Sequence, residues 1–210
     1  MPYIHKTPAW LKYLYPSLTW DRSEHPDKVI YLTFDDGPIP EVTEFVLDTL
    51  DHFEAKATFF CVGENIEKHQ SVASAVLERG HLIGNHTHNH IKGWNTSNEK
   101  YADNIRLCDA AIEGLGISNN NYFRPPYGRI GPGQIKMIKS DYEIVMWDVL
   151  TGDYNSALSA NAIFKSVTKV TQPGSIVLFH DSIKAYPRMK EVLPDYLSYF
   201  SERGYTFKTL

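Results

Sequence analysis

Two adjacent carboxylates, Asp35 and Asp36, follow the apolar run 29–32 and stand directly before Gly37 and Pro38. Neighbouring side chains on an extended strand point in opposite directions, so two adjacent acids can serve one site only where the strand ends. Gly and Pro are residues of turns, which puts both acids at the carboxyl end of a buried strand. Burying an unpaired carboxylate is costly, so the sequence predicts a metal ion or an arginine as its partner.

Candidate metal ligands follow at His86 and His90, two imidazoles four residues apart that can reach one ion from a helical turn or a tight loop. One aspartate and two histidines leave open positions on a divalent ion, as is needed where water or substrate must also bind. His88 lies between them and is expected to support a ligand or to face solvent. The remaining histidines show no partner pattern and are expected to have no role at the site: His5, His25, His52, His69 and His81.

Two further segments carry groups that suit acid–base chemistry. Arg124 begins the segment 124–128 (RPPYG), where two prolines stiffen the loop. A guanidinium there can hold a carboxylate through two hydrogen bonds, and a stiff loop can offer a backbone N–H to a developing oxyanion. His180 follows the apolar run 175–179, in a place suited to an acid catalyst, and Asp153 is a carboxylate that can orient it.

Short strands and helices must position these residues. The hydrophobic pattern predicts seven strands, at 29–34, 57–61, 81–84, 121–124, 143–147, 175–179 and 205–208. It predicts a short amino-terminal helix and six more helices, at 42–53, 66–77, 101–115, 135–138, 163–170 and 189–200. Ser97 or Asn98 is expected to cap the helix 101–115, and Ser159 the helix 163–170. This alternation predicts an α/β fold of parallel βα units, a single (β/α) barrel that is distorted and seven-stranded, with an open doubly wound sheet as the alternative.

The placement of the polar candidates favours the barrel. They follow predicted strands in chain order: Asp35 and Asp36, then His86 and His90, Arg124, Asp148 and Asp153, and His180. In a barrel the loops after the strands converge on one face, where such folds build their active sites.

The length, composition and charge of the chain limit the number of domains and the kinds of partner to be expected. A chain of 210 residues with 42% hydrophobic composition suits one domain, with residues 1–28 as an amino-terminal arm packed on a domain of residues 29–210. The net charge of −4, without any basic block, argues against nucleic acid and anionic membranes and favours a neutral partner.

Cys61 and Cys108 continue apolar patterns and are expected to be buried free thiols. We expect a monomer.

The amino-terminal sequence indicates the cellular compartment in which the protein is expected. Residues 1–20 contain prolines, lysines and a histidine that interrupt any apolar stretch, so they do not resemble a signal peptide, and no other segment could span a bilayer. The expectation is a cytoplasmic protein as the sequence stands, or an extracytoplasmic one if the chain is trimmed.

Four segments together resemble the polysaccharide deacetylase family, also called the NodB homology domain or carbohydrate esterase family 4. The likeness runs from about Lys28 to the carboxyl terminus. Its motifs stand in order at 33–38 (TFDDGP), 86–90 (HTHNH), 124–128 (RPPYG) and 177–180 (VLFH). The resemblance implies a metal-dependent hydrolase that removes N-acetyl groups from N-acetylglucosamine-containing glycans, either chito-oligosaccharide or peptidoglycan. It also implies one divalent ion, with Zn²⁺ expected and Co²⁺, Ni²⁺ or Mn²⁺ as alternatives.

The resemblance further implies a role for each site residue. Asp35 would be the general base, held by Arg124, and the metal ligands would be Asp36, His86 and His90. His180 would be the general acid, tuned by Asp153, and the Tyr127 N–H would donate to the oxyanion. The substrate-binding residues would be Leu178, Tyr154 and Trp147.

The fourth motif, 147–154, departs from the family pattern. Leu150 stands where an aspartate is common, and Tyr154 replaces the usual tryptophan of one groove wall, so the groove is expected to differ in shape. One alternative function is an O-acetyl esterase acting on acetylated xylan or a similar glycan, and another is a non-catalytic carbohydrate-binding module. Asp35, His180 and all three candidate ligands are present, which favours an enzyme over the binding module.

Overall fold

The computed structural model describes residues 3–24, 27–117 and 121–210, and His25 lies outside these residues. Its central strand is β1 (Val29–Asp35), which pairs in parallel with β7 (Ile176–His180) along one edge. Along the other edge β1 pairs with β8 (Thr206–Lys208) near its start and with β2 (Thr58–Cys61) near its end. The position between these neighbours explains why the run of apolar residues in β1 is almost wholly buried.

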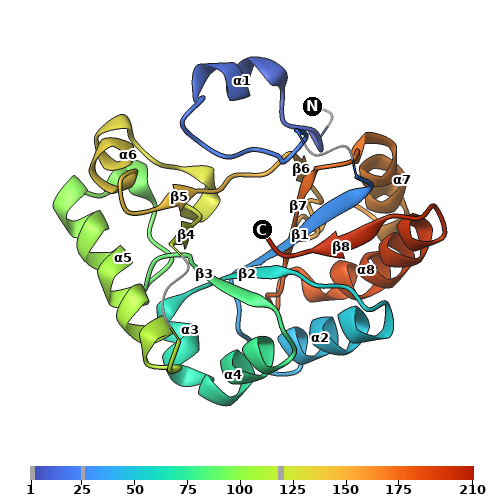
Figure 1. The fold of residues 1–210 in the computed structure, drawn as a ribbon, viewed down its shortest axis with the longest axis horizontal. Coiled ribbons are helices and arrows are strands. Elements are labelled where there is room, and N and C mark those ends of the chain that lie inside the picture. Colours follow the sequence, from blue (N-terminus) through green and yellow to red (C-terminus); the bar gives the residue numbers. More distant parts are fainter. Residues whose placement is uncertain (1–2, 25–26, 118–120) are drawn as a thin grey trace.

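The sheet is parallel throughout and curls with its helices outside (Figure 1). Its strand order is β5-β4-β3-β2-β1-β7-β6, with β3 (Leu82–Asn85), β4 (Tyr122–Phe123), β5 (Glu143–Ile144) and β6 (Val149–Leu150). The seven strands β1 to β7 form an open, distorted barrel, and β8 adds a short eighth strand. The predicted fold class is therefore confirmed, although the predicted strand 143–147 is shortened to β5 and the strand β6 was not predicted.

Helices follow most of the strands. Their bounds are α2 (Val42–His52), α3 (Gly63–Lys68), α4 (Gln70–Glu78), α5 (Asn98–Glu113), α6 (Pro132–Ile138), α7 (Ala160–Val170) and α8 (Tyr186–Ser201). The predicted helix 66–77 is two helices, because His69 between them has a non-helical backbone with φ −133° and ψ 48°. The Ser97 and Ser159 side chains accept backbone N–H bonds at the starts of α5 and α7. No helix of the described residues is long and apolar enough to cross a membrane.

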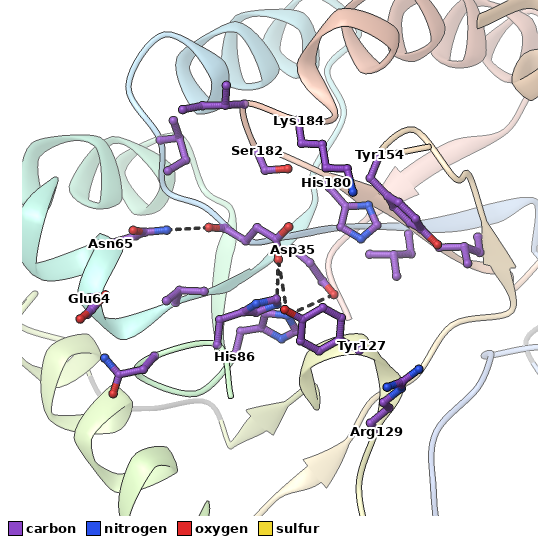
Figure 2. Close-up of a pocket in the computed structure, with 18 of the residues that line it drawn as sticks. Asp35, Glu64, Asn65, His86, Tyr127, Arg129, Tyr154, His180, Ser182 and Lys184 are labelled. Atoms are coloured by element: carbon purple, nitrogen blue, oxygen red, sulfur yellow. Dashed lines mark hydrogen bonds and ion pairs between the residues drawn. The ribbon is translucent and has the colours of Figure 1, made fainter. Parts of the chain in front are cut away.

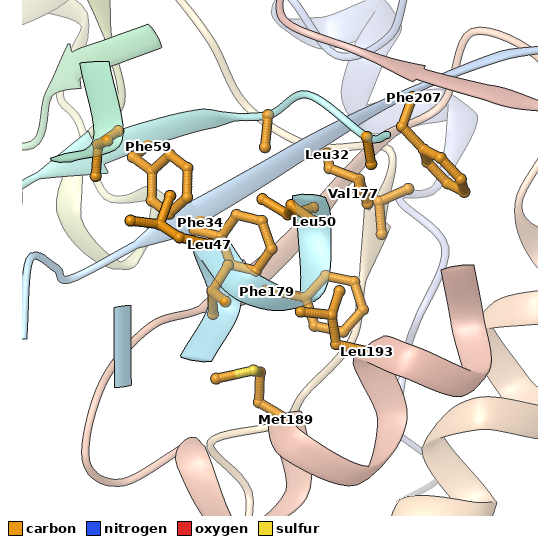
Figure 3. Close-up of a cluster of buried hydrophobic side chains, with 14 of the residues drawn as sticks. Leu32, Phe34, Leu47, Leu50, Phe59, Val177, Phe179, Met189, Leu193 and Phe207 are labelled. Carbon is orange, nitrogen blue, oxygen red and sulfur yellow. The ribbon is translucent and has the colours of Figure 1, made fainter. Parts of the chain in front are cut away.

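The main core lies between the sheet and the helices around it, and Figure 3 shows the part of it against α2 and α8. Leu32 and Phe34 of β1 pack there with Phe179 of β7, all of them fully buried. Because side chains alternate along a strand, the residues between them face the inside of the barrel. Thr33 and Asp35 of β1 therefore share the inner face with residues of β7, and the register pairs Asp35 with His180.

The amino-terminal arm crosses the gap between β5 and β6, and Figure 1 shows its short helix α1 (Ala9–Leu14) above these two strands. Lys6 forms an antiparallel bridge with Val149 of β6, and Thr19 forms a parallel bridge with Val145 directly after β5. The arm thus adds backbone pairing at the edge that would otherwise stay open. The division of the chain at residue 28 stays a prediction.

Asp148 was expected at a strand's carboxyl end with the site, and this expectation is wrong. It precedes β6, and its buried carboxylate accepts hydrogen bonds from Lys6 and Lys12, each at 2.5 Å, and from Ser175 at 2.6 Å. Ser175 precedes β7, whereas His180 ends it, so Asp148 lies at the opposite end of the barrel from His180. Its role is to anchor the arm.

Candidate active site

The loops at the carboxyl ends of the strands hold the site residues in an unusual backbone conformation. The strand β1 ends at Asp35, and Asp36 has a left-handed backbone with φ 83°, so the two neighbouring carboxylates can serve one site. Thr87, His90 and Tyr127 also have positive φ values, of 62°, 52° and 60°. Such conformations cost about 1–3 kcal/mol each in residues other than glycine and cluster at functional sites.

Asp36, His86 and His90 each turn one ligand atom toward a common point, and these atoms lie within 4.8 Å of one another. His90 Nε2 is 3.1 Å from Asp36 Oδ1, and His86 Nε2 is 3.8 Å from it. The Arg124 carbonyl accepts a 2.7 Å hydrogen bond from His86 Nδ1, which leaves Nε2 as the ligand atom. The structure brings together all three predicted ligands in a set that can hold a divalent ion.

The protonation states of these groups also suit a metal. Burial lowers the pKa of His86 to about 4, despite the nearby Asp35 carboxylate, so its imidazole is neutral at pH 7. Burial alone would raise the pKa of Asp36, but the hydrogen bond from His90 and the positive charge of the His180 imidazolium bring it well below its ordinary value. A neutral imidazole and an ionised carboxylate are the forms that bind metal.

Asp35 is fixed by Arg124, which is completely buried. Arg124 Nη1 donates 2.8 Å hydrogen bonds to Asp35 Oδ1 and to Thr33 Oγ1, while its other nitrogens donate to the carbonyls of Val145 and Met146. The predicted pairing through two hydrogen bonds to one carboxylate is therefore wrong, because the backbone carbonyls occupy the rest of the guanidinium. Asp35 Oδ2 has no bond to Arg124 and lies 3.7 Å from His86 Nε2, on the side of the metal ligands.

His180 is oriented by Asp153, whose side chain is fully buried. The backbone N–H of His180 donates to Asp153 Oδ2 and its ring Nδ1 to Oδ1, both at 2.8 Å. Burial lowers the pKa of His180, but the charge and hydrogen bond of Asp153 raise it to about 9, so the ring is protonated at pH 7. The Tyr154 ring packs edge-on against His180 at 4.9 Å, and its hydroxyl is 2.6 Å from the Tyr3 hydroxyl. The arm thus reaches the wall of the site.

These groups surround one pocket of about 870 Å³ at the carboxyl ends of the strands (Figure 2). The predicted site residues that line it are Asp35, Asp36, His86, His90, Tyr127, Trp147, Tyr154, Leu178 and His180. Arg124 and Asp153 do not line it but hold Asp35 and His180 from behind. Leu150, at the position where the family motif often has an aspartate, also lines the pocket and makes that part of the wall apolar.

The histidines expected to stay outside the site do so, as far as the structure describes them. His88 Nε2 lies 3.2 Å from Glu67 Oε1, and His88 does not line the pocket. His5, His52, His69 and His81 do not line it either. Cys61 and Cys108 are buried free thiols, as predicted.

Sequence reasoning missed Asp181, which is completely buried directly after His180. Its carboxylate accepts hydrogen bonds from the Gly37 N–H at 3.1 Å and from Thr43 Oγ1 at 2.6 Å. Asp181 thereby ties the loop that carries Asp36 to the end of β7. Burial raises the pKa of Asp181 to about 8, and the negative charge of Asp36 adds to that rise. The signal that could have revealed it is an acid next to a strand-end histidine, a place with little access to water.

Comparison with known proteins agrees with these motifs. A family model described as polysaccharide deacetylase matches residues 22–142, more than half of the chain. Two relatives from Bacillus cereus are each named peptidoglycan-N-acetylglucosamine deacetylase. One is 36% identical over 154 residues, 73% of this chain and 56% of the relative, so the chain spans little more than half of its length. The other is 34% identical over 195 residues, 92% of this chain and 91% of the relative.

A solved structure matches nearly the whole fold. It is a crystal structure of a peptidoglycan N-acetylglucosamine deacetylase in complex with 4-naphthalen-1-yl-N-oxidanyl-benzamide, with a TM-score of 0.88 and 30% sequence identity. The match covers 97% of this chain and 95% of that chain. With the family model and the relative matched over most of both lengths, it shows that the chain belongs to the polysaccharide deacetylase family, carbohydrate esterase family 4.

Proposed function

We propose that this chain is a metal-dependent hydrolase that removes N-acetyl groups from glycans containing N-acetylglucosamine. One observation carries the proposal. A single pocket joins a cluster of one aspartate and two histidines to a carboxylate held by a buried arginine and to an imidazolium held by a buried aspartate. These are the parts that amide hydrolysis requires, namely a site for a Lewis acid, a base for water and an acid for the leaving nitrogen.

Asp36, His86 and His90 would hold the divalent ion, and the family is metal-dependent. Zn²⁺ suits a set of one carboxylate and two imidazoles with open positions, and Co²⁺, Ni²⁺ and Mn²⁺ are the alternatives. When bound, the ion would polarise the amide carbonyl and lower the pKa of a water molecule beside it.

Asp35 would act as the general base. Arg124 holds one carboxylate oxygen and leaves the other on the side of the metal ligands, where it can accept a proton from the attacking water. The backbone N–H of Tyr127, on the proline-stiffened loop, would donate to the developing oxyanion. Both groups are fixed before substrate arrives, which avoids a cost of reorganisation during the reaction.

His180 would protonate the leaving nitrogen. An amide needs this step because an amine anion is a very poor leaving group, and the Asp153 pairing keeps a proton on the imidazole at neutral pH. Leu178 lies on the same strand, two residues earlier and on the same face, so it would contact the acetyl methyl group. Trp147 and Tyr154 would form walls for the sugar ring.

Acetate release from a panel of acetylated glycans tests this proposal, with metal content measured on the same sample. We expect release from N-acetylglucosamine oligomers, with one divalent ion per chain. Acetate from acetylated xylan alone would instead support the O-acetyl esterase. Binding of both glycans without any acetate release would support the non-catalytic module.

The oligomeric state and the cellular compartment of the protein are also part of the proposal. A monomer as the active unit stays a prediction. Cytoplasmic location stays a prediction, and cell fractionation tests it. If peptidoglycan is the substrate, the enzyme must work outside the cytoplasmic membrane.

A further inference from the structure

The amino-terminal arm runs beside the segment that carries one wall of the site. Lys6 forms an antiparallel bridge with Val149 of β6, and the Leu150 N–H donates to the His5 carbonyl at 2.8 Å. His5 Nδ1 in turn lies 3.0 Å from the Leu150 carbonyl oxygen. Because the two segments run in opposite directions, the arm residues before His5 lie beside the loop that follows β6. Tyr3 is the arm residue that reaches this loop.

Tyr3 fits closely against Gly152 in the loop. Gly152 has a left-handed backbone with φ 71°, a conformation that favours glycine. A side-chain carbon added there would lie 2.6 Å from Tyr3 Cε1 and 2.8 Å from the Tyr3 hydroxyl oxygen. The Tyr3 ring thus occupies the space that any side chain at position 152 would need. Its place is therefore fixed by this close contact as well as by the pairing of the arm with β6.

The Tyr3 hydroxyl lies 2.6 Å from the hydroxyl of Tyr154. The Tyr154 ring lines the pocket, and its centre is 4.9 Å from that of the His180 ring. Figure 2 shows the Tyr154 ring beside His180, with its hydroxyl end pointing away from Asp35. Among the residues that the structure describes, Tyr3 is the sole hydrogen-bond partner of the Tyr154 hydroxyl. Tyr3 therefore holds the Tyr154 ring from the side that lies away from the catalytic groups.

The neighbouring catalytic pair is held independently of Tyr3. Asp153 accepts two hydrogen bonds from His180, and Arg188 donates to the Asp153 carbonyl. Loss of the Tyr3 hydroxyl would leave these bonds in place and would release only the Tyr154 ring. A ring that must be ordered when a sugar binds weakens binding by about two- to tenfold, which is the cost of immobilising one side chain.

We propose that Tyr3 is a positioning residue for substrate binding, which holds Tyr154 in the orientation in which its ring forms a wall for the sugar. Tyr3 does not line the pocket and acts through Tyr154. The hydroxyl pair exists because Tyr154 replaces the tryptophan that is usual at this position of the family motif. This inference rests on the proposed function, in which Tyr154 contacts the glycan, and it makes the arm a part of the glycan-binding site.

The variant Tyr3→Phe tests the inference, because it removes one hydroxyl and keeps the ring that packs on Gly152. With an N-acetylglucosamine oligomer as substrate, the variant should raise KM about two- to tenfold. Its kcat and the alkaline limb of its pH profile should stay at the wild-type values, because the bonds of His180 with Asp153 are unchanged. The matched control is Tyr13→Phe on the same arm, whose side chain is 88% exposed, and it should keep the wild-type KM.

A double-mutant cycle with Tyr154→Phe shows whether the two hydroxyls act as one pair. Either single variant removes the same hydrogen bond, so both should raise KM by the same factor, and the double variant should raise it no further. Two independent effects on KM would instead multiply in the double variant. Thermal unfolding of all four proteins shows whether a change in KM merely follows a loss of stability.

The outcomes separate this inference from the proposed function. If the wild-type enzyme releases acetate and Tyr3→Phe keeps the wild-type KM, the inference is overturned and the proposed function stands. Effects that multiply in the double variant, or a lower kcat with a displaced alkaline limb in Tyr3→Phe, also overturn it, since Tyr3 would then act apart from Tyr154 or through His180. If the metal-loaded wild-type enzyme releases no acetate from the oligomer, the proposed function fails and the inference fails with it.

Discussion

At the scale of single residues, the chemistry depends on two groups that adjacent strands bring together. The register pairs Asp35 of β1 with His180 of β7, so a base and an acid stand beside each other at the ends of neighbouring strands. Each is held by a buried partner of opposite charge, Arg124 for Asp35 and Asp153 for His180. Their roles can therefore be tested separately.

The variant Asp35→Asn tests the base. The amide is nearly the same size and can still accept the Arg124 hydrogen bond, but it cannot take a proton from water. We expect turnover to fall by about two to four powers of ten while the metal content stays at the wild-type level. Acetate release and metal analysis on the same preparation check this. Turnover close to wild type would place the base elsewhere.

The pH profile tests the acid. Because the pKa of His180 is raised to about 9, the protonated imidazole persists through neutral pH, and activity should fall as pH rises through that range. A divalent ion nearby would oppose this rise, so the alkaline limb of the loaded enzyme should lie somewhat lower. Asp153→Asn removes the charge that raises the pKa, so the limb should move to lower pH. An alkaline limb that Asp153→Asn leaves in place would contradict the pairing.

The leaving group provides a second test of His180. An alkoxide or aryloxide leaves far more readily than an amine anion, so an acid catalyst matters more for an amide than for an activated ester. His180→Ala should reduce acetate release from N-acetylglucosamine oligomers much more than hydrolysis of an aryl acetate. Equal losses on both substrates, with metal content unchanged, would mean that His180 acts by positioning rather than as the acid.

Residue types and spacing were enough to predict which residues would meet at the pocket, because strand ends in a barrel converge on one face. They were not enough to distinguish the two ends of a short strand. Asp148 was assigned to the wrong end because the segment 143–150 bends and restarts as β6, which no local pattern reveals. Asp181 was missed because its importance comes from burial and from Gly37, which is distant in the sequence.

At the scale of elements, the loop from β1 to α2 must hold Asp36 in place, and Asp181 braces it. A side-chain carbon added at Gly37 would lie 1.9 Å from Asp181 Oδ2, so only glycine fits there unless Asp181 moves. The missing side chain at Gly37 leaves room for the Asp181 carboxylate beside the Gly37 N–H. Metal affinity should depend on it, since partners that orient ligands commonly contribute ten- to a hundredfold.

Asp181→Ala tests this brace. It leaves the Gly37 N–H and the Thr43 hydroxyl buried without their acceptor, so we expect the metal dissociation constant to rise about tenfold or more, with some loss of stability. Competition with a chelator measures the first effect and thermal unfolding the second. Asp195→Ala on the exposed face of α8 is the control. A lower melting temperature with unchanged metal affinity would make Asp181 merely structural.

Helices and strands were predicted well where periodicity was long, as in α5 and α8, whose apolar stripes pack on the core. The prediction failed where one residue changes the backbone locally. His69 divides the helix predicted at 66–77, and the strand predicted at 143–147 ends after Ile144, while β6 was not predicted. Such local changes of the backbone are not contained in the apolar pattern of a segment.

At the scale of the whole molecule, the arm completes the sheet between β5 and β6 through its anchor at Asp148. Two lysines, Lys6 and Lys12, neutralise that buried carboxylate. Replacing both by methionine keeps most of the apolar stem but leaves the charge unpaired. We expect the free energy of unfolding to fall by about 1–3 kcal/mol, less than for a fully buried pair because both lysines are partly exposed.

Denaturant unfolding measures that loss, and Lys190→Met with Lys208→Met is the control for removing two exposed lysines. Because the arm reaches Tyr154 through Tyr3, we expect the Lys6 and Lys12 double variant to lose activity as well, at temperatures where it is still folded. A double variant as stable as wild type would show that the arm is not anchored at Asp148. The sequence predicted an arm packed on the domain but not this contact, because it joins residues more than 130 positions apart.

The measurement that tests the central claim most directly is a titration of metal-free protein with Zn²⁺, with acetate release from an N-acetylglucosamine oligomer as the readout. Activity should be absent at the start, rise in proportion to added metal and level off at one equivalent per chain. His90→Ala should gain almost no activity at one equivalent, because it lacks one of the three ligands. Full activity in the metal-free protein, or a His90→Ala titration that matches wild type, would contradict the account.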